Sequence, residues 1–152
     1  MKICFVPFFE KGNVFRYNGT YFFDDFMLSI ELMIIKYFYE IKNHDLIVKA
    51  LKGTVYSEIF KDFLKKNKYP NIYYQDGNLT DVLEKCDLAI IDFPSSSILE
   101  ANKANIPTLV LSYEALEIRE NALKKYSKIE IFKYKHQQEI LTKISEFIKN
   151  NS

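Results

Sequence analysis

The sequence has little cysteine and no long hydrophobic run. Cys4 and Cys86 are its only two cysteines, and both lie in apolar or helical segments that suit buried thiols rather than a disulfide or a metal pair. No stretch of about 18 apolar residues is present to cross a bilayer, and the amino terminus does not have the order of a secretory signal peptide. We therefore expect a soluble protein of a reducing, cytoplasmic compartment.

The chain is also poor in net charge and in glycine. Its 21 lysines and arginines nearly balance 20 acidic residues, so the charge gives no reason to expect a nucleic acid as partner. Four glycines are present, but no glycine-rich dinucleotide motif opens the first helix and no phosphate loop appears. We expect neither a nicotinamide cofactor nor ATP hydrolysis, and no metal ion.

Length and hydrophobic pattern indicate one α/β domain over residues 1–152, large enough for a sizeable core. Short apolar runs predict strands at residues 3–6, 46–48, 71–74, 88–91, 108–111 and 129–132. Helical patterns predict helices at 24–42, 57–68, 79–86, from the serines at 95–97 to residues 101–105, at 114–125 and at 137–149. Such alternation predicts a Rossmann-like, doubly wound parallel six-stranded sheet with helices on both faces.

The helix predicted at residues 24–42 is apolar around much of its circumference. Burial between the sheet and another element is one explanation for this width. Docking of a partner protein is the other, and it would suit a non-catalytic Rossmann-like interaction module that has lost its ligand. Both explanations stay open at this point.

The stretch from Asp87 to Ala101 combines a buried strand, a tight turn and a helix start. Leu88 to Ile91 is an unbroken apolar run, and Pro94 ends it. Three serines at 95–97 can cap the next helix and present hydroxyl and N–H groups where the helix dipole favours an anion. Glu100 follows one turn later. This combination predicts a phosphate site, although a plain helix cap and a solvated acid would also account for it.

Further polar loops follow other strands, and the carboxyl ends of parallel strands share one edge of the sheet. A long loop with Lys11 and Arg16 follows the first strand, and a turn with Lys49 and Lys52 follows the second. These four cations are candidates to neutralise a bound diphosphate. The alternative is a mobile first loop and solvated lysines.

The segment from Asp87 to Ala101, followed by Asn105-Ile-Pro-Thr-Leu-Val-Leu111, resembles the C-terminal, donor-binding half of GT-B fold glycosyltransferases. Nucleotide-sugar 2-epimerases belong to the same wider group, and the glycerol-phosphate polymerases of wall teichoic acid look similar. The resemblance covers most of the chain from Ile3 onward. It rests on the order and spacing of motifs that are loose individually.

The resemblance implies a role for each matched residue. Ser95, Ser96 and Ser97 would hold the diphosphate of a nucleotide-activated donor, and Glu100 would accept hydrogen bonds from the ribose hydroxyls. Tyr74 and Gln75 lie where the family places the base, with packing at a strand end as the alternative. The expected function is therefore nucleotide-sugar binding by a transferase that builds surface polysaccharide.

One departure from the family pattern limits this expectation. A complete GT-B enzyme has a second, N-terminal domain that binds the acceptor and commonly supplies the catalytic base. Here no base is evident, because His44 and His136 lie in segments where solvated histidines are typical. We expect an acceptor-binding domain in the same or another chain, negligible turnover by this chain alone and no assigned catalytic residue. Peripheral membrane association through the partner domain stays open.

Overall fold

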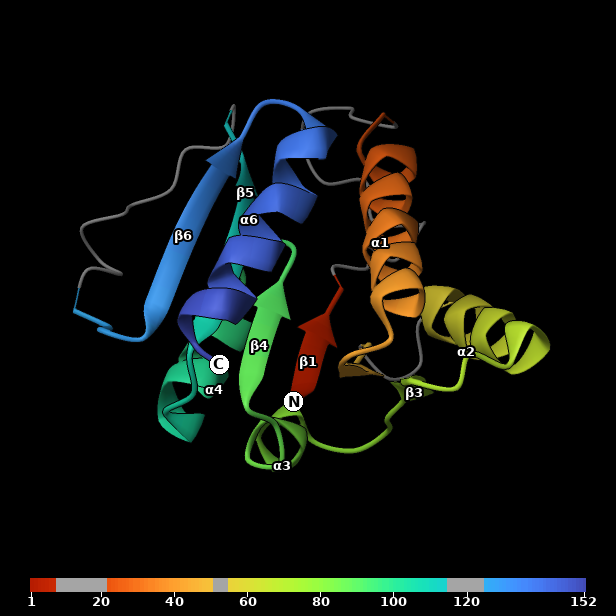
Figure 1. Ribbon diagram of the computed structural model, residues 1–152, viewed down its shortest axis with the longest axis horizontal. Helices are drawn as coiled ribbons and strands as arrows, with labels where there is room; N and C mark the ends of the chain where they lie inside the picture. The colour runs from red at the N-terminus through yellow and green to blue at the C-terminus, as the bar shows by residue number, and fades with distance from the viewer. Residues whose placement is uncertain (8–21, 51–54, 115–124) are drawn as a thin grey trace.

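A computed structural model of the chain describes residues 1–7, 22–50, 55–114 and 125–152 and confirms the doubly wound α/β fold (Figure 1). One all-parallel, six-stranded sheet has the order β3-β2-β1-β4-β5-β6. The strands are β1 Lys2–Val6, β2 Asp45–Val48, β3 Ile72–Tyr74, β4 Leu88–Ile91, β5 Thr108–Tyr113 and β6 Ile129–Tyr134. The described helices are α1 Phe22–Ile41, α2 Val55–Asn67, α3 Leu79–Leu83, α4 Ser97–Ala104 and α6 Gln137–Asn150.

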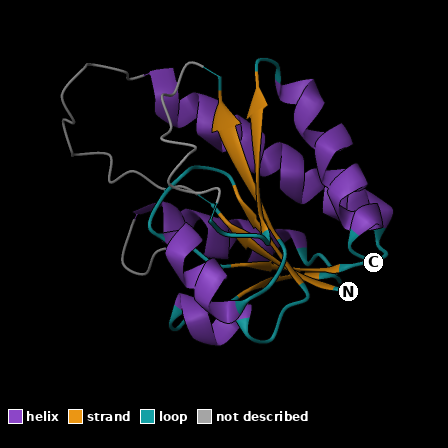
Figure 2. Ribbon diagram, turned by 90° about the vertical axis from the view of Figure 1, so that its left-hand side faces the viewer, coloured by secondary structure: helices purple, strands orange, loops and turns teal. Residues whose placement is uncertain are grey.

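Helices cover both faces of the sheet, as Figure 2 shows edge-on. Apolar residues of α1, α2 and α6 pack on one face, in a core that includes Phe5 and Ile90. Residues of α3 and α4 pack on the other face, around Cys4 and Ile91. Successive residues of β1 and β4 therefore point into different cores, which explains why both strands are continuous apolar runs.

Several elements differ from their predicted bounds. Helix α2 begins at Val55, so Ser57 lies inside it rather than capping it. Strands β5 and β6 each continue two residues beyond the apolar runs that predicted them, to Tyr113 and Tyr134. Parallel pairing in register extends to those two tyrosines and carries the ladder past the polar pair Ser112 and Lys133. The helix predicted at 114–125 falls almost entirely on residues 115–124, outside the described part of the chain.

The broad apolar face of α1 is explained by packing within the domain. Its residues Met27, Ile30, Ile34 and Phe38 are buried in the core shared with α6. Among the described side chains of α1, the large hydrophobic residues Leu32 and Tyr39 are exposed. Of the helices in the described ranges, none combines the length and apolar character that crossing a membrane requires.

The environment predicted for the two cysteines is confirmed, but the one predicted for His44 is wrong. Cys4 and Cys86 are free and buried, as predicted. His44 was expected to be solvated, but it is half-buried at the turn before β2. Burial lowers its pKa because desolvation penalises the charged imidazolium.

The position of β5 between β4 and β6 predicts a large effect of truncating its core residue. Leu109 is 0% exposed, and Leu109→Ala should lower the free energy of unfolding by about 2–5 kcal/mol because it leaves a cavity. Urea denaturation measures this change. The matched control is Leu99→Ala on α4, where the side chain is 50% exposed and the loss should stay within about 0.5 kcal/mol. Equal losses for the two variants would contradict this assignment of the core.

Candidate functional site

The predicted serine turn lies where the chain changes direction in the sheet. Strands β1 and β4 are hydrogen-bonded neighbours, but the chain continues from β1 toward β2 on one side and from β4 toward β5 on the other. In an open α/β sheet, the crevice at such a switch point is the usual ligand site. Residues 92–96 leave β4 at this point, and the Asp92 N–H donates to the Val6 carbonyl across it at 3.4 Å.

The turn is closed by backbone hydrogen bonds and by one serine side chain. The N–H groups of Ile98 and Leu99 donate to the carbonyls of Ser95 and Ser96, at 3.2 and 2.9 Å. Ser96, the N-cap residue, has helical φ and ψ of −59° and −19°, and its side chain makes no capping hydrogen bond. The Ser97 N–H approaches Ser95 Oγ at 3.4 Å. Ser95 therefore supplies one side-chain hydrogen bond to the helix start, as the sequence predicted for the serines, whereas Ser96 supplies none.

Glu100 lies one turn into α4, on the side that faces α3. Its carboxylate is half-buried, and Oε2 accepts a hydrogen bond from Thr80 Oγ1 at 3.2 Å. The two helices pack side by side on the same face of the sheet. Glu100 is therefore held by the fold rather than fully solvated. The sequence did not single out Thr80, because this contact depends on how α3 meets α4.

Lys49 is the candidate cation that the structure describes, and it is not solvated. Its exposed fraction is 6%, and its Nζ donates to the carbonyl of Ala50 at 2.9 Å. Lys49 follows β2, so it lies at the same sheet edge as the serine turn. The solvated alternative is wrong for this residue. Lys11, Arg16 and Lys52 lie outside the described residues.

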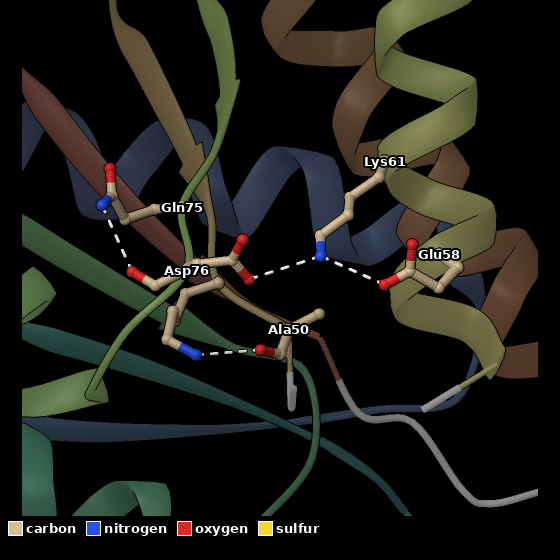
Figure 3. Close-up of polar contacts among 6 residues, drawn as sticks. Ala50, Glu58, Lys61, Gln75 and Asp76 are labelled. Atoms are coloured by element: carbon tan, nitrogen blue, oxygen red, sulfur yellow. Dashed lines mark hydrogen bonds and ion pairs between the residues drawn. The ribbon is translucent and has the colours of Figure 1, made fainter. Parts of the chain in front are cut away.

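Tyr74 and Gln75 lie at the end of β3, in a turn that is tied to α2 (Figure 3). The Gln75 N–H donates to the Val48 carbonyl at 3.0 Å. Next to it, Asp76 forms an ion pair with Lys61 at 3.5 Å. A positive φ of 108° at Gly77 then turns the chain toward α3, a conformation that glycine adopts without strain.

Lys61 on α2 contacts three groups near the turn after β3. This role was not predicted from the sequence. Besides Asp76, Lys61 contacts Glu58 Oε1 at 3.1 Å, and its ammonium lies 4.9 Å from the centroid of the Tyr74 ring. The hydrogen bond to Glu58 raises the pKa of Lys61 and so favours its charged form. The spacing of Glu58 and Lys61 on one helix face was the available signal, but it did not reveal the partners at the end of β3 and in the turn after it.

Asp92 is a second residue that was not among those predicted for the site. It is buried at the carboxyl end of β4, on the same sheet edge as the serines. Burial, followed by the charges of Asp92 and Tyr113, raises the pKa of Tyr134 well above its ordinary value. Tyr134 therefore stays protonated at neutral pH. No cluster of three or more potential metal ligands occurs within the described part of the chain.

The Lys61 contacts predict a measurable stiffening of the turn after β3. Lys61→Met removes the charge and keeps the aliphatic stem, so Asp76 loses its ion pair. The Gln75 amide should then exchange with solvent about two- to fivefold faster in a hydrogen-exchange experiment. Lys36→Met, which removes an exposed pair with Glu40 on α1, is the control and should leave this amide unchanged. Identical exchange in all three proteins would show that the pair does not restrain the turn.

Comparison with known proteins shows the family to which the chain belongs. A search among curated proteins finds no match. The sequence model of a family described as LIC12162 family transferase matches residues 34–143, which is more than two thirds of the chain. The matched region runs from the middle of α1 into α6 and includes the serine turn, Glu100 and the turn after β3. The chain therefore belongs to the LIC12162 family of transferases.

Proposed function

We propose that this chain binds the donor substrate of the transferase, a nucleoside-diphosphate sugar or a related activated donor used to build surface polysaccharide. The observation that carries the proposal is the position of the serine turn at the switch point between β1 and β4, with Glu100 one turn further along α4. A diphosphate suits hydroxyl and N–H donors at a helix start, and a carboxylate suits the hydroxyls of ribose.

The distances across the sheet fit a nucleoside diphosphate. Strand β3 is separated from β4 by β2 and β1, which corresponds to three strand spacings, or roughly 14 Å. A base at Tyr74 and Gln75 and a diphosphate at residues 95–97 would lie at the two ends of this span. Thr80 and Glu100 come from the helices that follow these two turns, so the ribose would lie between the two ends.

Because Lys49 is buried, we propose that it stabilises negative charge on the bound donor from a fixed position, rather than as a flexible surface side chain. Its ammonium lies at the carboxyl end of β2, between the turns that follow β3 and β4. A cation held there would stabilise the negative charge that develops on the departing nucleoside diphosphate. Lys11, Arg16 and Lys52 remain proposed contributors to the same positive potential. In this proposal the chain supplies the donor half of the reaction. A second domain, in this chain or another, would supply the acceptor and the base, without a metal ion in the donor site.

Isothermal titration calorimetry with UDP, CDP and GDP tests donor binding. At least one of them should bind at millimolar concentration or below. Glu100→Ala should weaken that binding about 10- to 100-fold, because charged hydrogen bonds to ribose are lost. Glu146→Ala makes the same change of charge on the exposed side of α6 and should bind like the wild type.

Two results would count against this function. If none of the three nucleotides binds at millimolar concentration, the donor proposal fails. If Ser96→Ala lowers the melting temperature and leaves nucleotide affinity unchanged, the serine turn has only a structural role.

A further inference from the structure

The contact between Thr80 and Glu100 joins two helices that approach the proposed site from different strands. Thr80 lies in the first turn of α3, which follows β3, and Glu100 lies in the first turn of α4, which follows β4. Their side chains are 20 residues apart in sequence and meet through a hydrogen bond of 3.2 Å in a partly buried position. A hydroxyl in the first turn of a helix can bond locally to backbone groups. That of Thr80 donates to a carboxylate on another helix instead.

This hydrogen bond occupies one oxygen of Glu100 and leaves the carboxylate with acceptor capacity. An ionised carboxylate has about four lone-pair sites on its two oxygens, and Thr80 uses one of them. Within the described residues, the hydrogen bond from Thr80 to Oε2 is the one that the Glu100 carboxylate accepts. Glu100 is also only half-buried, so the carboxylate can reach a ligand while one of its oxygens is held.

Holding one oxygen fixes the other. A glutamate side chain loses about 1.5–2 kcal/mol of rotamer freedom when it is immobilised. Where a contact within the protein has already restricted the side chain, less of this cost falls on ligand binding. The Thr80 hydroxyl has one proton and donates it to Oε2, so it takes one acceptor site of the carboxylate and leaves the others for ribose hydroxyls to donate to.

We propose that Thr80 is a positioning residue that orients Glu100 toward the two ribose hydroxyls and thereby sets the preference of the site for ribonucleotides over analogues that lack both hydroxyls. The proposal rests on the function proposed above. It goes beyond that function by assigning the selectivity to a pair of residues on two helices, one of which makes no contact with the ligand.

Calorimetric titration with two matched ligand sets tests the role of Thr80. The ligands are UDP, CDP and GDP, together with their 2′,3′-dideoxy analogues. Wild-type protein should prefer the ribo form. Thr80→Val keeps the shape of the side chain and removes the hydroxyl, and it should weaken ribonucleotide binding about three- to tenfold. The affinity for the dideoxy analogue should not change, because that analogue makes no contact with Glu100.

Thr80→Ser is the matched control, because it restores the hydroxyl and should bind both ligands within about twofold of the wild type. Equal weakening of both ligands by Thr80→Val would show that Thr80 acts through the fold, and unchanged binding of both would show that it does not position Glu100. Either result overturns the inference and leaves donor binding intact. Wild-type protein that binds neither form of any nucleotide overturns the proposed function and this inference together.

Discussion

The pairing of β1 with β4 is the constraint on which the rest of the structure depends. Four residue pairs, from Ile3 with Leu88 to Val6 with Ile91, align these buried strands at the middle of the sheet. Because the chain leaves the two strands in opposite directions, α1 and α4 must cover opposite faces. The carboxyl ends of both strands then lie at the switch point of the sheet, where open α/β sheets usually bind their ligands.

The side chains of the candidate site depend on this arrangement in two ways. The serine turn follows β4 directly at this switch point, and Glu100 lies one turn further along, in α4. The connection from β3 to β4 crosses the opposite side of the sheet from α1, so α3 packs against α4 and Thr80 meets Glu100. A contact between distant sequence positions thus follows from strand order.

Local sequence predicted most of the fold and only part of the site. Strand β4 was predicted with its observed bounds, because an apolar run between acidic residues and a proline is unambiguous. The ends of β5 and β6 were not predicted, since Ser112 and Lys133 interrupt the apolar pattern while their backbones still pair. The burial of Lys49 and the contact of Thr80 were missed for the same reason: both arise from tertiary packing, which neither periodicity nor turn chemistry encodes.

Amide chemical shifts measured by NMR during titration with UDP, CDP or GDP test most directly whether the switch point is the ligand site. The account predicts that the largest changes fall on residues 95–100 and on Tyr74 and Gln75, at the carboxyl ends of β4 and β3. Changes confined to the opposite edge of the sheet, around Asp45 and Asp87, would contradict it. So would changes confined to the exposed side of α1 around Leu32 and Tyr39.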